Sequence, residues 1–210
     1  MHHPKIKGWT HKELEFEAEK LLSDFSKLGC YDNRALRIEA LIDRYGLRVI
    51  QVKGLSEIAE AVLPIKEGYI LIDEDRYNDV SSELMVRFTL AEELCHNVLH
   101  RPLFSGKTLD QIRRFQESLS DTQYERIERE AKHMAGALLM SGPVYRHRFA
   151  HFMATQNGSP HSQVTKLRYV IRQLTFDFAV SFQAATLRGV ILGLLDWEQY
   201  NDLMELISRS

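Results

Sequence analysis

The sequence has 210 residues, of which 44% are hydrophobic and 27% are charged, a composition typical of a folded globular chain rather than of a disordered or fibrous one. Its 27 basic and 29 acidic residues give a formal net charge of -2, so the chain lacks the strongly basic balance of many nucleic-acid-binding proteins. Two cysteines are too few for a disulfide framework, and neither a signal peptide nor an apolar run of roughly 20 residues is visible, which predicts a cytoplasmic protein without membrane spans.

Two helices are expected at the start of the chain. Thr10 and Glu13 have the spacing of a capping box, which marks the beginning of a helix. We expect its apolar face to consist of Leu14, Phe16, Ala18, Leu21, Leu22 and Phe25. A second helical stretch over residues 33–45 is followed by Gly46, a residue type typical of helix C-termini.

The periodicity then changes. Residues 47–52 and 68–73 are short and rich in β-branched side chains, which predicts two strands of a small sheet. From residue 80 onwards the pattern is helical, with helices expected at 80–100, 107–118, 121–140, 143–154, 162–178, 183–194 and 196–208. The stretch 156–160, Gln-Asn-Gly-Ser-Pro, reads as a linker, so we predict a core over residues 1–155 and a C-terminal helical subdomain over residues 156–210 packed on it.

The helix expected at 80–100 carries a cluster of ionisable residues. Glu92, His96 and His100 recur every four residues and therefore share one helix face, with Glu93 beside it. This spacing lets two side chains bind one metal ion while a neighbouring carboxylate acts on a water that the ion activates. Surface helices also carry acids and histidines for solvation alone, so the spacing by itself leaves both interpretations open.

Two linked motifs extend this pattern. Residues 87–100 read RFTLAEELCHNVLH, and residues 128–140 read EREAKHMAGALLM, with Pro143 shortly after. They resemble the R-F-T-L-A-H-E-L-G-H-x-x-x-H and E-x-E-A-x-x-F-A-x-x-L-L-M-P motifs of the ImmA/IrrE family of metallopeptidases, and the resemblance covers roughly residues 33–145. It implies an α+β, mostly α-helical fold in which a small sheet packs on a zincin-type pair of helices.

The same resemblance implies a set of site residues. Glu93 takes the place of the general base, and Glu92, His96 and Glu128 take the places of the metal ligands. The family has histidine where this sequence has Glu92, and glycine where it has Cys95. Zinc is the expected cofactor, with manganese as the alternative, because exchanging a nitrogen ligand for oxygen favours harder ions. The added negative charge also makes a water on the ion less acidic, which handicaps catalysis.

Two alternatives remain open from the sequence. In a shifted register His96 and His100 bind the metal, but Asn97 then occupies the position of the base and cannot accept a proton. If neither register holds a working site, the chain is a non-catalytic pseudo-peptidase that binds a regulatory partner.

The resemblance further implies a function. The expected activity is metal-dependent cleavage of a transcriptional repressor or another regulatory protein as part of a stress response. DNA binding by this chain is not expected, because the stretch 182–190 offers chiefly Gln183, Thr186 and Arg188 for reading a groove. Four further residues are candidates for stabilising an oxyanion: Tyr124, Tyr145, His147 and His151.

Overall fold

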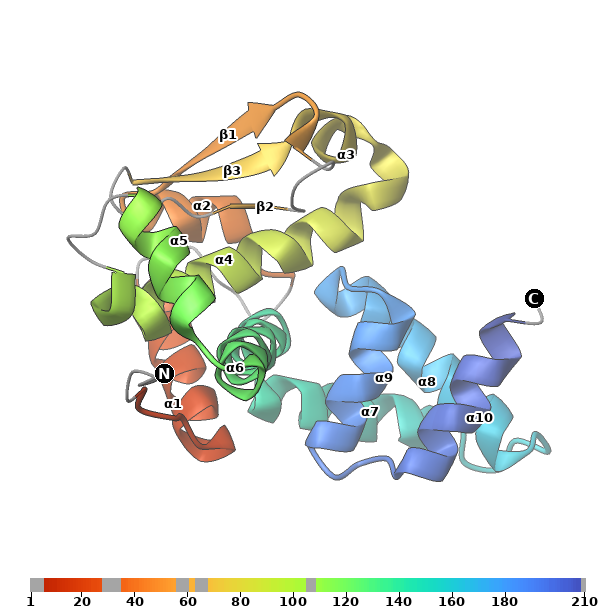
Figure 1. Ribbon diagram of the computed structural model, residues 1–210. Coiled ribbons are helices and arrows are strands. Elements are labelled where there is room, and N and C mark those ends of the chain that lie inside the picture. Colours follow the sequence, from red (N-terminus) through yellow and green to blue (C-terminus); the bar gives the residue numbers. More distant parts are fainter. Residues whose placement is uncertain (1–5, 28–34, 56–60, 63–67, 105–108, 209–210) are drawn as a thin grey trace.

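The computed structural model describes residues 6–27, 35–55, 61–62, 68–104 and 109–208, and this part of the chain has the predicted α+β, mostly helical fold (Figure 1). Its helices are α1 (His11–Ser26), α2 (Ile38–Arg44), α3 (Glu74–Asn78), α4 (Glu83–Phe104), α5 (Leu109–Ser118), α6 (Asp121–Leu139), α7 (Gly142–Thr155), α8 (Gln163–Phe178), α9 (Phe182–Ile191) and α10 (Trp197–Ser208), with a 3-10 turn at Val80–Ser82. The strands are β1 (Arg48–Val52), β2 (Ala61–Val62) and β3 (Tyr69–Asp73). None of the described helices is both long and apolar enough to cross a membrane.

The sheet is small and lies beside α4 (Figure 1). Its strand order is β1-β3-β2, with β1 parallel to β3 and β2 antiparallel to β3. Both predicted strands are confirmed, whereas the expectation of only two strands misses β2. A two-residue strand is too short to produce a periodic pattern in the sequence.

Helix α1 begins as predicted and differs from the expectation at one residue. Both hydrogen bonds of the capping box join Thr10 and Glu13. The expected apolar face is buried except for Phe16, whose side chain is 66% exposed. Two residues advance a helix by about 200°, so Phe16 lies on the face opposite to Leu14, and the prediction for Phe16 was wrong.

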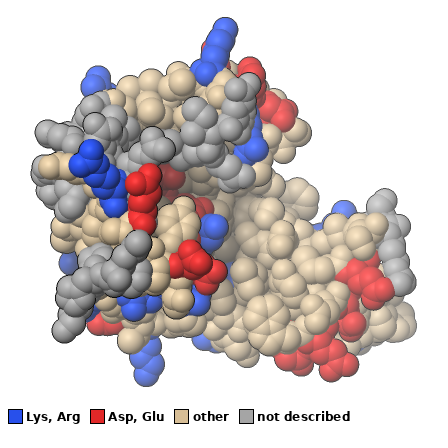
Figure 2. Space-filling view, viewed as in Figure 1, with Lys and Arg blue, Asp and Glu red and all other residues tan. Residues whose placement is uncertain are grey.

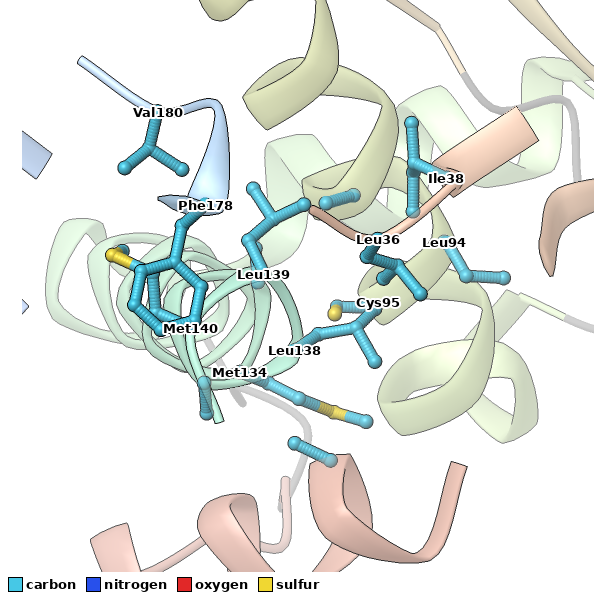
Figure 3. Packing of buried hydrophobic residues seen from close by; sticks show 14 of the residues in the cluster. Leu36, Ile38, Leu94, Cys95, Met134, Leu138, Leu139, Met140, Phe178 and Val180 are labelled. Carbon is cyan, nitrogen blue, oxygen red and sulfur yellow. The ribbon is translucent and has the colours of Figure 1, made fainter. Parts of the chain in front are cut away.

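The hydrophobic core forms where α4 crosses α6. Figure 3 shows Leu94 and Cys95 of α4 near Met134 and Leu138 of α6, and all four side chains are completely buried. Cys95 therefore fills the position of the family's glycine as a small core residue. Leu84, in the first turn of α4, is by contrast 38% exposed.

Arg188 links the C-terminal helices to the rest of the chain. Its side chain is 1% exposed and forms a bidentate salt bridge with Glu15 of α1. Its Nε donates to the backbone carbonyl of Met140 at 3.0 Å.

The burial of Arg188 also bears on DNA binding. Because Thr186 is completely buried as well, two of the three residues considered for reading DNA are inaccessible. Helices α7 to α10 pack on one another in Figure 1, and the proposed domain boundary after residue 155 stays a prediction.

Candidate metal centre

The crossing of α4 and α6 brings three predicted ligands together. Glu92 and His96 lie one turn apart on α4, and Glu128 approaches them from α6. One ligand atom from each lies within 4.8 Å of the other two, and all three side chains are half-buried. The His96 Nε2 atom is 3.6 Å from Glu128 Oε1. One imidazole nitrogen and two carboxylate oxygens at this spacing match the donors that bind divalent zinc or manganese.

Glu93 lies beside this cluster on α4 and is half-buried. Burial raises the pKa of Glu93, the charge of His96 opposes this shift, and the negative charges of Glu92 and Glu128 add to it, so that the pKa is about 7. A carboxyl group with a pKa near 7 is suited to accept and return a proton near neutral pH.

Positive charge beside these carboxylates comes from the chain itself. Burial alone would lower the pKa of His96, but its contact with Glu128 and the charges of Glu93 and Glu92 raise it. The Lys132 Nζ atom lies 3.8 Å from Glu92 Oε1. A divalent cation bound here would therefore compete with protons for His96 and with Lys132 for Glu92.

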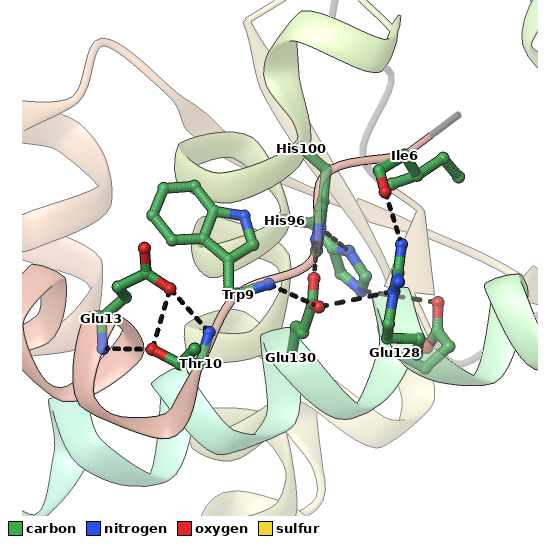
Figure 4. Close-up of polar contacts among 9 residues, drawn as sticks. Ile6, Trp9, Thr10, Glu13, His96, His100, Glu128 and Glu130 are labelled. Carbon is green, nitrogen blue, oxygen red and sulfur yellow. Dashed lines mark hydrogen bonds and ion pairs between the residues drawn. The ribbon is translucent and has the colours of Figure 1, made fainter. Parts of the chain in front are cut away.

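His100 faces away from the three ligand atoms. It is 1% exposed, with its Nδ1 3.2 Å from His96 Nδ1 and its Nε2 3.2 Å from Glu130 Oε2 (Figure 4). Burial lowers the pKa of His100 to about 4, so the ring is neutral at physiological pH. Its Nε2–H then donates to Glu130, and its Nδ1 accepts from His96. This arrangement leaves His96 Nε2 for the cluster and favours the first register over the shifted one.

Glu130 closes this chain of hydrogen bonds. Its Oε1 accepts from the backbone N–H of Trp9 at 2.9 Å (Figure 4). The same oxygen lies 3.6 Å from Arg126 Nε. Sequence reasoning assigned no role to Glu130 or Trp9. The E-x-E spacing in the second motif was the available signal for Glu130, whereas Trp9 lies 121 residues away and no local pattern links the two.

The four candidates for oxyanion stabilisation differ in their exposure and in their distance from the cluster along the chain. Tyr124 lies one turn before Glu128 on α6 and is 47% exposed, and the charge of Glu128, burial and the charges of Glu92 and Glu93 raise its pKa. Tyr145 was a wrong candidate, because it is completely buried and its hydroxyl donates to the carbonyl of Ala185 at 2.6 Å. The two remaining candidates lie exposed on α7, at His147 and His151.

Comparison with known families identifies the family of the chain. A family model for M78 peptidases, described as an IrrE N-terminal-like domain, matches residues 76–188. This span is more than half of the chain and includes both helices of the cluster, α4 and α6. The chain belongs to the M78 peptidase family. Membership confirms the relation to ImmA/IrrE metallopeptidases that the two linked motifs predicted.

Other comparisons add information on the fold of this M78 member. No curated protein matches the sequence. Among solved structures, a transcriptional regulator from Mycobacterium tuberculosis is similar, with a TM-score of 0.52 and 18% sequence identity. The match covers 87% of this chain but 47% of the regulator, so this chain spans about half the length of that protein. At this identity the likeness shows a shared fold alone.

Replacing His100 by phenylalanine is expected to weaken zinc binding by about 10- to 100-fold, the usual effect of removing a hydrogen-bond partner that orients a metal ligand. Phenylalanine keeps the buried ring but removes both of its hydrogen bonds, so His96 loses the acceptor for its Nδ1–H. The dissociation constant is measured by competition with a fluorescent zinc chelator.

A matched control is His133→Phe. His133 is also buried and bonded to a carboxylate, at 3.2 Å from Glu15 Oε1, but it contributes no atom to the cluster. This variant should retain the parent's zinc affinity. An equal loss in both variants would mean that the effect is a general consequence of removing a buried histidine.

Proposed function

We propose that this chain is a metal-dependent endopeptidase of the ImmA/IrrE type. The observation that carries the proposal is the placement of ligand atoms from Glu92, His96 and Glu128 within 4.8 Å of one another, beside the half-buried carboxyl of Glu93. Membership in the M78 family of peptidases supports hydrolysis of peptide bonds as the reaction.

The proposed roles follow from position. Glu92, His96 and Glu128 hold a divalent ion, and the ion, when bound, supplies Lewis-acid activation of water and of the scissile carbonyl. Glu93 accepts the proton of the attacking water on its carboxylate and returns it to the nitrogen of the leaving amine. The hydroxyl of Tyr124, which is close enough to Glu128 for that charge to raise its pKa, is proposed to donate to developing negative charge on the carbonyl oxygen.

The proposed cofactor is zinc, with manganese as the alternative. A single imidazole with two carboxylates retains zinc ligands but shifts the preference towards harder cations. Metal content is measured by mass spectrometry on protein purified without chelators or nickel affinity resin. Near-stoichiometric zinc or manganese supports the proposal, and protein that stays metal-free after dialysis against either ion contradicts it.

The proposed substrate is a regulatory protein, such as a transcriptional repressor, cleaved in the cytoplasm during a stress response. The resemblance to ImmA/IrrE proteins supports this choice, and the similar Mycobacterium tuberculosis protein is itself described as a transcriptional regulator. The substrate is sought in an extract of the source cells, where mass spectrometry detects new protein N-termini after zinc-loaded protein is added.

Replacing Glu92 by histidine is expected to raise the zinc affinity by about tenfold or more, because imidazole nitrogen is a better zinc ligand than carboxylate oxygen. The change also removes the contact between Glu92 and Lys132. Isothermal titration with zinc measures the gain. The control is Glu83→His, which adds a histidine to the exposed first turn of the same helix. Equal affinities of the parent and Glu92→His would argue against Glu92 as a ligand.

A non-catalytic pseudo-peptidase is the second candidate, and the contact of Lys132 with Glu92 favours it. An amine at 3.8 Å from a ligand oxygen neutralises the charge that would attract a metal ion. This candidate predicts a protein that binds its partner equally well with and without chelator and forms no cleavage product with zinc or manganese.

A further inference from the structure

A second surface feature lies away from the cluster, on the C-terminal helices. A groove of about 580 Å³ runs between the start of α4, the outer face of α8 and the end of α10. Its lining includes Leu84, Arg168, Tyr169, Arg172, Phe176 and Ile207. None of these residues takes part in the proposed metal site.

Four large apolar side chains in the lining of the groove are exposed. Phe176 is 78% exposed, and Leu84, Tyr169 and Ile207 are each between 38% and 41% exposed. Large apolar side chains gathered on one exposed surface are typical of a binding site, because burying them removes unfavourable contact with water. Phe176 contributes nothing to the described core, so stability of the fold does not explain its position.

The charged side chains of this lining are both positive. Arg168 and Arg172 lie one turn apart on α8, and neither forms an ion pair with another described residue. The acidic residues of α10, which Figure 2 shows as a band of acidic surface, do not belong to this lining. A ligand with carboxylates is therefore attracted to the groove, and a basic one is repelled.

The shape of the groove favours one side of a helix. Its floor is a helix face presenting Tyr169, Arg172 and Phe176 at positions i, i+3 and i+7, and the ends of α4 and α10 form its walls. An amphipathic helix fits such a surface by placing its own apolar residues, at the same spacing, into the groove. Small ligands favour sites that enclose most of their surface, which a groove of this open form does not do.

We propose that this groove docks an acidic amphipathic helix of a partner protein. The apolar stripe of that helix covers Phe176 and Tyr169, and carboxylates beside the stripe pair with Arg168 and Arg172. This inference does not depend on the proposed peptidase activity, since docking uses no residue of the cluster. The Glu93→Gln variant should therefore bind the helix with the same affinity as the parent. A failure of the peptidase proposal would leave the docking proposal unaffected, and the reverse also holds.

The test uses two synthetic 18-residue peptides labelled with fluorescein. Both carry leucine at i, i+3, i+4 and i+7 repeats and differ only in having glutamate or lysine beside the leucines. Fluorescence anisotropy should give a dissociation constant at least tenfold lower for the acidic peptide. The difference should shrink between 50 and 300 mM NaCl, because salt screens the charge pairs.

Variants then locate the binding surface. The double variant Arg168→Glu/Arg172→Glu should lose the preference for the acidic peptide, and Phe176→Ser should weaken its binding about tenfold or more. Matched controls are Arg146→Glu on the exposed surface of α7 and Phe16→Ser on α1, whose side chain is also largely exposed. Both controls should bind like the parent, with circular dichroism confirming that every variant is folded.

Three outcomes would overturn the proposal. Equal affinity for the two peptides would remove the role of charge, and unchanged binding by the Arg168→Glu/Arg172→Glu variant would place the peptide elsewhere. The third outcome concerns self-association of the chain, which sedimentation velocity measures. If the parent self-associates and Phe176→Ser abolishes this, the groove binds a second copy of the chain, whose acidic α10 supplies the carboxylates, and no separate partner is needed.

Discussion

Replacing Glu93 by glutamine is expected to lower peptide-bond cleavage by about 10²- to 10⁴-fold, the range expected for loss of a positioned general base. Glutamine keeps the size of the side chain but cannot accept a proton near neutral pH. Because Glu93 is not one of the three proposed ligands, the variant should bind zinc as the parent does. The readout is the set of new protein N-termini that appear in a cell extract after addition of each zinc-loaded protein.

Two measurements on each variant distinguish the loss of the general base from the loss of bound metal. Zinc affinity is measured on the same preparations, so reduced cleavage with unchanged affinity identifies a role in the reaction. Glu125→Gln is the matched control, since Glu125 is exposed on α6 and has no part in the cluster. Cleavage by Glu93→Gln at the parent's rate would show that another group accepts the proton and that the proposed mechanism is wrong.

A large effect on stability is expected at Arg188, which contacts the C-terminal end of α6. Replacing Arg188 by methionine should lower the free energy of unfolding by about 3 kcal/mol, because it leaves Glu15 without its main partner and a buried carbonyl without a donor. For a chain of this size this corresponds to a fall in Tm of about 6–12 °C. Thermal unfolding followed by circular dichroism measures the change.

The same ion pair determines how stability responds to acid. Burial by itself would raise the pKa of Glu15, but hydrogen bonds from Arg188 and His133 and their charges lower it to about 2. A carboxyl with a depressed pKa in the folded state adds stability above its ordinary value of 4.5 and loses that contribution as the pH falls towards 2. The difference in stability between the parent and Arg188→Met should therefore be constant above about pH 5 and shrink below it.

Arg146→Met serves as the control for this pair of measurements. Arg146 is exposed on α7, so its loss should change Tm by no more than about 1–2 °C, as for most surface substitutions. An Arg188→Met variant whose deficit is the same at pH 3 and pH 7 would mean that packing, and not the pairing of Glu15, accounts for its instability.

The residues of the cluster differ in how far sequence reasoning could place them. Glu92 and His96 follow from helical spacing alone, because four residues complete about one turn. Glu128 lies on another helix, and only the second motif linked it to this site. Its approach to His96 depends on how α4 and α6 pack, which is determined by core residues such as Cys95 and Leu138 that carry no chemical signature.

Other features were beyond the reach of local patterns. The bond from Trp9 to Glu130 joins residues 121 positions apart, and a two-residue strand such as β2 has no period. Phe16 was misplaced for a different reason. Its hydrophobic side chain suggested burial, whereas its angular position on the helix directs it towards solvent. Hydrophobic character is a weaker guide than angular position for a single residue on an amphipathic helix.

Lys132 lies beside Glu92 and His96 lies beside Glu128, and these contacts have a consequence for how a metal ion would bind here. Because these contacts offset part of the acidic charge, we expect the chain to stay folded without a metal ion, unlike small zinc domains that unfold when the metal is withdrawn. Under the proposed function, an ion would then enter and leave a chain that stays folded. Its occupancy would follow the free concentration of the ion in the surroundings, so the cellular metal supply would turn the site on or off within the lifetime of one molecule.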